Sequence, residues 1–215
     1  KNRPIPAGRI PAINALIFGA ILAVFGVFFI YVTINVLTAI ICFLTVFLYL
    51  FVYTPSKRFS TLNTLIGSIP GALPVLGGWT AATNNLNSAS WILFSILFCW
   101  QIPHFLAIAI IYAKDYKKGG FKMLPSEYPN SKHTQYHVLF FSIAMVGTSL
   151  GLYFENIVDL GYLLGISVTG ILFLVVVLQF SFNSSSRNAK KLMRATLFYF
   201  PLMFILIILD ALDII

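Results

Sequence analysis

The fold follows from a long run without charged side chains, residues 10–56, which reads IPAINALIFGAILAVFGVFFIYVTINVLTAIICFLTVFLYLFVYTPS. A second run without Asp, Glu, Lys or Arg covers residues 59–113. Because a helix needs about 20 mainly apolar residues to cross a bilayer, each run is long enough for two membrane spans. The first run divides at the polar residues near 33–35, and the second divides at the stretch 84–88, NNLNS.

Composition indicates a membrane protein rather than a soluble domain. Apolar residues make up 59% of the chain and charged residues 9%, whereas soluble domains have about 45–50% and about 25%. Cys42 and Cys99 both lie within apolar runs, so two buried thiols are favoured over a disulfide or a metal pair. The predicted fold class is therefore an all-α, polytopic membrane bundle. Seven spans are expected, at residues 13–32, 35–53, 61–82, 89–113, 137–154, 160–182 and 195–213.

The distribution of charge predicts which way the bundle faces. All 14 Lys and Arg residues fall at one end of the expected helices, together with only Asp115 and Glu127 among the acids. Cytoplasmic loops collect basic residues, so this end is predicted to be cytoplasmic, with the N-terminus inside and the C-terminus outside. The net charge of +8 then reflects topology, and no nucleic-acid partner is expected. The other end carries acids alone: Glu155, Asp159, Asp210 and Asp213.

Residues 1–215 are predicted to form a single transmembrane domain, in which residues 114–136 make a cytoplasmic loop. Loops longer than about 12–15 residues are uncommon unless they are functional or disordered. Three basic clusters converge on this face, at 3–9 (RPIPAGR), 53–58 (YTPSKR) and 114–120 (KDYKKGG). These cations suit a phosphate-bearing substrate, although topology alone is the alternative explanation.

One acidic side chain, Asp115, is out of keeping with this cationic loop. Mg²⁺ prefers carboxylate oxygens and completes its shell with substrate phosphates, so Asp115 is a candidate metal ligand. An ion pair with Lys114 or Lys118 is an equally good interpretation.

Two polar side chains lie at membrane depth in residues 100–105, WQIPHF. Pro103 should kink the helix and free the carbonyl of Cys99. Polar residues are costly in the bilayer, so Gln101 and His104 are expected to face the bundle interior or a wet cavity. A functional role and a hydrogen bond to a neighbouring helix both explain them, and His104 is the stronger functional candidate.

Residues 67–79, GSIPGALPVLGGW, combine glycines and prolines within one expected span. Gly67 and Gly71 form a GxxxG pattern, which is typical of close helix packing. The two prolines also argue for an alternative, a broken helix whose unwound backbone lines a cavity. Asn63, just before this stretch, is an expected cavity-lining residue.

Together these motifs resemble the heme-directed branch of the intramembrane UbiA-type prenyltransferase superfamily, the protoheme IX farnesyltransferases or heme O synthases. The WQxPHF element and the DY that follows it favour this branch over quinone-directed relatives. Residues after 125 match only in length and hydrophobicity. The matching elements are RPIPAGRI at 3–10, YTPSKR at 53–58, the stretch 67–79, WQIPHF at 100–105 and DY at 115–116.

The resemblance implies transfer of a farnesyl group from farnesyl diphosphate to a vinyl group of heme b, which gives heme O for terminal oxidases. Mg²⁺ would accompany the diphosphate. The protein would span a bacterial inner membrane many times and pass its product to a downstream heme-modifying enzyme or a terminal oxidase. Roles then follow by motif: Lys57, Asp115 and Tyr53 would be catalytic, Asp115 as metal ligand; Arg3, Lys57, Arg58 and Lys118 would bind diphosphate; His104 and Gln101 would contact heme; Asn63 and Trp100 would line the cavity.

The chain also departs from this family. Its members have nine helices, and an Asp-rich metal motif lies upstream of their RPxPxGRI element. The 215 residues are therefore expected to lack two helices and the main Mg²⁺ ligands, and to be inactive by themselves. Two alternatives remain, namely a UbiA-type prenyltransferase for a quinone or aromatic acceptor, and a non-enzymatic transporter or assembly subunit.

Overall fold

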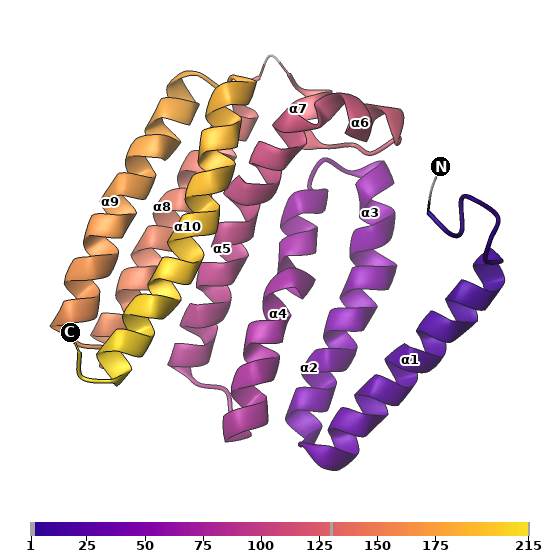
Figure 1. The fold of residues 1–215 in the computed structure, drawn as a ribbon, viewed down its shortest axis with the longest axis horizontal. Helices are drawn as coiled ribbons and strands as arrows, with labels where there is room; N and C mark the ends of the chain where they lie inside the picture. The colour runs from indigo at the N-terminus through magenta and orange to yellow at the C-terminus, as the bar shows by residue number, and fades with distance from the viewer. Residues whose placement is uncertain (1–2, 130, 215) are drawn as a thin grey trace.

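The computed structural model describes residues 3–129 and 131–214, which form helices and the loops that join them (Figure 1). One segment, η1, is π-helical and the others are α-helical. In chain order the elements are α1 (Ala12–Thr33), α2 (Val36–Phe47), η1 (Leu48–Tyr53), α3 (Thr54–Phe59), α4 (Asn63–Thr83), α5 (Ser88–Ile111), α6 (Ala113–Lys118), α7 (Leu124–Glu127), α8 (His133–Phe154), α9 (Leu160–Phe182) and α10 (Ser186–Ala211).

Seven helical spans within the described residues are long and apolar enough to cross a membrane, which confirms the predicted all-α, polytopic fold. One of them, Val36–Phe59, joins α2, η1 and α3 without a break. The first and the last described residues lie at opposite ends of the bundle, as an odd number of spans requires (Figure 1). Lys1, which the charge pattern assigns to the basic end, lies outside the described residues.

Two helices begin earlier than the hydrophobic pattern predicts. α8 begins at His133 rather than at residue 137, and α10 begins at Ser186 rather than at residue 195. The side chain of Ser185 caps α10 by accepting a hydrogen bond from the backbone N–H of Asn188. The apolar pattern marks only the part of a helix that suits hydrocarbon, whereas a capped helix continues beyond it.

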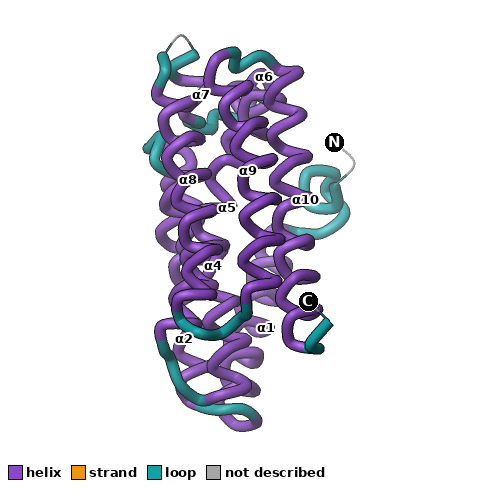
Figure 2. Tube along the Cα trace, turned by 90° about the vertical axis from the view of Figure 1, so that its left-hand side faces the viewer, coloured by secondary structure: helices purple, strands orange, loops and turns teal. Residues whose placement is uncertain are grey.

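The bundle consists of a packed core of helices and a single layer of helices that extends from it. α5, α8, α9 and α10 pack against one another around buried side chains such as Ile102, Met145 and Tyr199 (Figure 2). α4, α2 and α1 extend from α5 one after another (Figure 1). Among the described elements α1 packs against α2 alone, and none of its residues is buried. Both cysteines are free thiols; Cys99 is buried as predicted, whereas Cys42 is only half-buried.

The prolines do not break the helices that contain them. α4 is continuous from Asn63 to Thr83, with Pro70 and Pro74 inside it, and α5 continues through Pro103. The alternative prediction of an unwound stretch within residues 67–79 is therefore wrong. Helical backbone satisfies its own polar groups except the carbonyl four residues before each proline, and this is close to the arrangement that lipid demands. The glycines of α4 consequently act through the space they leave beside an intact helix.

Candidate functional site

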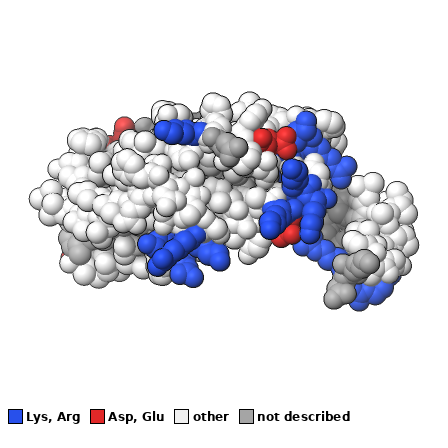
Figure 3. Space-filling view, turned by 90° about the horizontal axis from the view of Figure 1, so that it is seen from above, with Lys and Arg blue, Asp and Glu red and all other residues white. Residues whose placement is uncertain are grey.

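A cavity of about 390 Å³ lies toward the basic end of the bundle, between the span Val36–Phe59, α4, α5 and the loop after α6. Figure 3 looks onto this end and shows Lys and Arg side chains gathered there, with few acidic ones. We name it the Lys57 cavity after the basic residue that lines it. Its lining residues are Tyr49, Tyr53, Lys57, Asn63, Thr64, Gly67, Gly71, Gln101, Phe105, Tyr116, Phe121 and Met123.

A π-helical turn brings three side chains of one span to the same wall of the cavity. At the end of η1 the backbone N–H of Thr54 donates to the carbonyl of Tyr49, five residues back instead of four. Such turns are frequent at functional sites. The ammonium of Lys57 lies 4.1 Å from the ring centre of Tyr53 and 5.6 Å from that of Tyr49. Both rings therefore attract this cation through their π faces.

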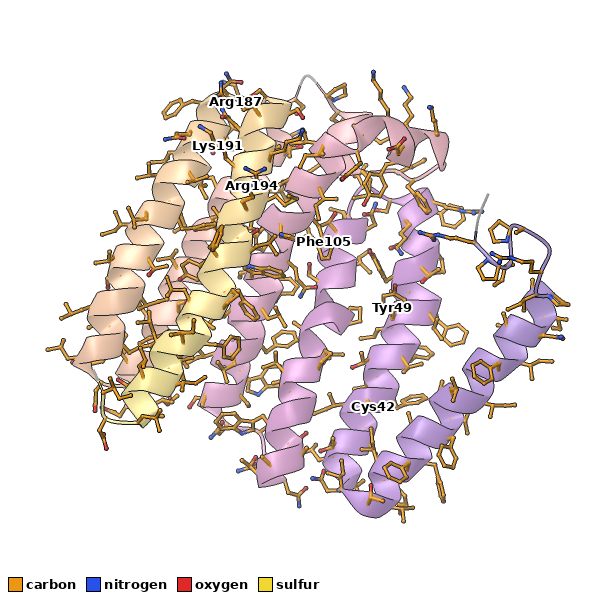
Figure 4. The ribbon with its side chains drawn as sticks, in the orientation of Figure 1. Cys42, Tyr49, Phe105, Arg187, Lys191 and Arg194 are labelled. Atoms are coloured by element: carbon orange, nitrogen blue, oxygen red, sulfur yellow. The ribbon has the colours of Figure 1, made fainter. Side chains whose placement is uncertain are left out.

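Two glycines of α4 make room for side chains that line the cavity. A Cβ atom at Gly67 would collide with the ring of Tyr53, and one at Gly71 would collide with the carboxamide of Gln101. The GxxxG pattern thus serves close packing, with the cavity-lining side chains of the neighbouring helices as its partners. Figure 4 labels Tyr49 and Phe105, which come from the elements on either side of α4.

Asn63 fastens the loop after α6 to the start of α4. Its side-chain Nδ2 donates to the carbonyl of Lys122 at 2.6 Å and to that of Ser60 at 2.7 Å. The backbone N–H of Lys122 in turn donates to the carbonyl of Lys57 at 2.9 Å. These bonds hold Phe121 and Met123 against the cavity, which gives the buried amide of Asn63 a structural role.

Gln101 is buried in the cavity wall, with 6% of its surface exposed. Its Nε2 donates to the carbonyl of Leu97 at 3.2 Å and to that of Ser68 at 3.3 Å. An amide nitrogen carries two hydrogens, so both are used. The Oε1 atom, by contrast, accepts no hydrogen bond from any described residue, and it lies beside Gly71.

Trp100 and His104 lie on the adjoining face of α5, against α10. Their rings stack with centroids 4.8 Å apart and planes 13° apart. The indole N–H of Trp100 donates to the carbonyl of Thr196 at 2.7 Å, and Nδ1 of His104 lies 2.8 Å from the Thr196 hydroxyl. That hydroxyl gives its one hydrogen to the carbonyl of Met193, so it accepts from Nδ1–H. His104 therefore keeps the lone pair on Nε2.

Phe105 connects the two faces of α5. It lines the Lys57 cavity, and its ring lies edge-on to that of His104, with centroids 5.5 Å apart. With 40% of its surface exposed, Phe105 forms a side wall and not a sealed partition. A group bound against His104 is therefore next to the cavity.

The predicted site residues fall into three sets. Tyr53, Lys57, Asn63 and Gln101 line the Lys57 cavity. Trp100, which was predicted to line the cavity, lies instead with His104 on the adjoining face. The structure therefore separates His104 from Gln101, the two side chains assigned to heme. The remaining predicted residues are exposed and do not line the cavity: Arg3, Arg58, Asp115 and Lys118.

The residues present do not build a metal site by themselves. No group of three or more His, Cys, Asp or Glu side chains in the described ranges is placed to hold a metal ion. Asp115 offers one exposed carboxylate on α6, whereas its neighbour Tyr116 is the one that reaches the cavity. Mg²⁺ needs near-octahedral oxygen coordination, which a single exposed carboxylate does not supply.

Sequence reasoning missed several aromatic residues of the cavity. Tyr49 precedes Tyr53 by four residues and Phe105 follows Gln101 by four, so helical spacing places each beside a predicted residue. Helical periodicity was therefore a signal that could have found both. Tyr116 lies on the short helix α6 and Phe121 in the loop after it, where no long periodicity predicts which side chains turn inward.

Comparison with known proteins gives related sequences over nearly the whole chain. The profile of the UbiA prenyltransferase family matches residues 1–207. The protoheme IX farnesyltransferase of Solibacter usitatus is 36% identical over 209 residues, covering 97% of this chain and 72% of that protein. The protein of the same name from Salinibacter ruber is 39% identical over 209 residues, covering 97% of this chain and 74% of that protein.

A solved structure has the same fold. It comes from a study of a digeranylgeranylglyceryl phosphate synthase in membranes and superimposes with a TM-score of 0.78. The match covers 99% of this chain and 74% of the solved one, at 24% sequence identity. At that identity the likeness establishes the helical arrangement alone.

Proposed function

Because the chain belongs to the UbiA prenyltransferase family, we propose that it transfers the farnesyl group of farnesyl diphosphate to a vinyl group of heme b, giving heme O. The protein is a multi-pass membrane prenyltransferase. One observation supports the choice of reaction most strongly. Phe105 lines the cavity that contains Lys57 and also touches His104, so a donor site and an acceptor site would share one side wall.

Lys57 is the proposed diphosphate contact inside the cavity. Breaking the allylic C1–O bond sends the electron pair to the diphosphate, whose negative charge grows in the transition state. A fixed cation at the leaving oxygen stabilises that state more than the ground state. Arg3, Arg58 and Lys118 are proposed to bind the outer phosphate, since they are exposed cations toward the same end.

His104 is the proposed heme contact, with Trp100 as its support. The Nε2 lone pair of His104 is available because Thr196 takes the Nδ1 proton. The vinyl group would supply its π electrons to C1 of the farnesyl group and form the new C–C bond. Water then adds to the resulting cation, which releases one proton. Atoms and charge balance as heme b, farnesyl diphosphate and water giving heme O, diphosphate and a proton.

Mg²⁺ is proposed only as an ion that arrives with the diphosphate. Asp115 is its proposed carboxylate partner, although the side chain does not line the cavity. The charge of the leaving group is therefore assigned to Lys57 and the other cations, and no step is assigned to the metal.

We further propose an inner-membrane location for a single transmembrane domain, with the basic end and the segment between α5 and α8, residues 112–132, in the cytoplasm. Basic loops are retained on the cytoplasmic side. The product, a heme with a long apolar tail, would pass within the bilayer to a downstream heme-modifying enzyme or a terminal oxidase.

The test is product analysis in proteoliposomes that contain the complete protein. Heme b, farnesyl diphosphate and Mg²⁺ are added, and the extracted hemes are identified by mass spectrometry. We expect heme O, a loss of about 100-fold in Lys57→Met, and little change in the control Lys190→Met, which alters an exposed cation of α10. Prenylation of a quinone precursor but not of heme would contradict the proposed acceptor. If no acceptor is prenylated, the proposed prenyl-transfer activity is wrong.

A further inference from the structure

The Lys57 cavity has a cationic side chain toward one end and a neutral polar side chain toward the other. Lys57 lies toward the mouth, and Tyr53 lies one helical turn deeper, against Gly67. Gln101 meets α4 one further turn down, at Gly71. Since a turn of four residues rises about 6 Å, the ammonium and the carboxamide stand near the two ends of the cavity, with aromatic rings between them.

The orientation of the Gln101 amide is fixed by its neighbours. Both Nε2 hydrogens are used on the carbonyls of Leu97 and Ser68. Rotating the amide by half a turn would set its oxygen against two carbonyl oxygens and lose both bonds. The Oε1 atom thus points away from those carbonyls, on the side of Gly71, which has no side chain to cover it.

The two hydrogen bonds that Nε2 donates would by themselves explain a polar side chain at position 101, since the bond to Ser68 joins α5 to α4. They do not account for the oxygen, which accepts no hydrogen bond from the described residues and belongs to a side chain that lines the cavity. A carbonyl oxygen is the negative end of the amide dipole, so it stabilises positive charge. The cavity offers such an atom at the opposite end from its cation.

We propose that Gln101 is a further catalytic residue of the transfer: its Oε1 stabilises the allylic cation that forms when diphosphate leaves. The inference rests on the proposed function. The C1–O bond breaks, its electron pair departs with the diphosphate at Lys57, and the positive charge spreads over C1 and C3 of the farnesyl group. The rings of Tyr49, Tyr53 and Phe105 present π electrons around the same space. Dipoles fixed before the reaction need not reorganise as charge develops.

Kinetics of Gln101→Met provide the first test, because Met keeps the length of the side chain and removes its oxygen. We expect kcat to fall about 100-fold, as for the loss of one pre-oriented dipole, while KM for farnesyl diphosphate stays within about twofold. The matched control is Gln179→Met, an exposed Gln of α9 outside the cavity. A kcat for Gln101→Met within about twofold of the parent overturns the proposal.

A binding measurement separates catalysis from damage to the fold. The cationic probe is an azafarnesyl ammonium ion, with protonated nitrogen in place of C3, added together with inorganic pyrophosphate. The second probe is farnesyl thiodiphosphate, which ionises poorly. We expect Gln101→Met to bind the ammonium probe at least about tenfold more weakly and the thiodiphosphate unchanged, since one lost dipole contact costs about that factor.

Equal weakening of both probes would mean that Gln101 only holds the helices together, and it overturns the proposal. So does unchanged affinity for the ammonium ion. The binding assay involves no heme, so its outcome is decisive even if the complete protein prenylates a different acceptor. Failure of the proposed acceptor and failure of this inference are therefore distinguishable.

Discussion

Thr196 fixes the orientation of His104, because its hydroxyl accepts the Nδ1–H of the imidazole across 2.8 Å. The Thr196 hydroxyl donates its one hydrogen to the carbonyl of Met193, so it acts as the acceptor toward His104. A residue of α10 thereby selects which ring nitrogen of α5 keeps a lone pair. This link gives the last span a part in a site whose other residues come from earlier spans.

Replacing Thr196 by Val should weaken binding of heme b. Val keeps the shape of the side chain and removes the acceptor, which releases the His104 tautomer. We expect a loss of about 1 kcal/mol, or about fivefold in affinity, measured by absorbance titration of the complete protein with heme b. Thr196→Ser is the control and should bind as the parent does. Equal affinity of the Val and Ser variants would refute the role of this hydrogen bond.

Replacing Gly71 by Ala should reduce activity with little loss of stability. The new Cβ displaces the carboxamide of Gln101, while Ala favours the helix by about 1 kcal/mol relative to Gly. We expect kcat to fall about tenfold or more, with a melting temperature close to that of the parent. Gly78→Ala is the control on the same helix, since its Cβ meets no atom within 4 Å. It should be fully active, and equal activity of the two variants would contradict the prediction.

Replacing Asn63 by Ala should loosen the loop after α6. The side chain is 2% exposed and bonds two backbone carbonyls, so its removal takes one donor from each. We expect a fall of about 1–3 kcal/mol in the free energy of unfolding. Trypsin should also cleave faster at Lys122. The control Asn85→Ala removes an exposed amide at the opposite end, and the prediction fails if both variants are cleaved at the parental rate.

Replacing Asp210 by Asn should affect stability but not catalysis. The Asp210 carboxylate accepts the backbone N–H of Asp159 at 2.9 and 3.2 Å, at the N-terminus of α9. A negative charge there is favourable to the helix, so we expect a loss of about 1 kcal/mol in thermal unfolding. Asp213→Asn, an exposed neighbour with positive φ, is the control. A large loss of prenyl transfer in Asp210→Asn would instead indicate a functional path through the far end of the bundle.

The global arrangement was predictable because hydrophobicity and charge act on whole segments. The runs 10–56 and 59–113 each had to cross the bilayer twice, and the basic residues had to share one end. The sequence also pointed to Lys57 and Tyr53 as site candidates, since both lie at a span end within a recognisable motif. The start of α10 was missed because a cap and not hydropathy determines it.

The division of α5 into two faces was beyond the sequence. Gln101 and His104 are three residues apart, close enough on a helix to serve one ligand. Their separation depends on which neighbours pack beside them: α4 offers Gly71 to one, and α10 offers Thr196 to the other. Such choices arise from contacts between distant segments. The same holds for Asp115, whose adjoining Tyr116 occupies the inward position.

The span that contains η1 makes chain length, as well as chemistry, a determinant of the site. One residue of a regular α-helix corresponds to a rotation of about 100°. The wide turn takes up one extra residue within Leu48–Tyr53, so deleting an apolar residue there would restore the ordinary pitch with little rotation of the residues that follow. A deletion in the regular helix before it, Val36–Phe47, would instead turn Lys57 by about 100° away from Gln101, with its charge and its neighbours in sequence unaltered. One apolar residue lost from Val36–Phe47 would therefore move Lys57 out of the cavity while every motif stayed intact.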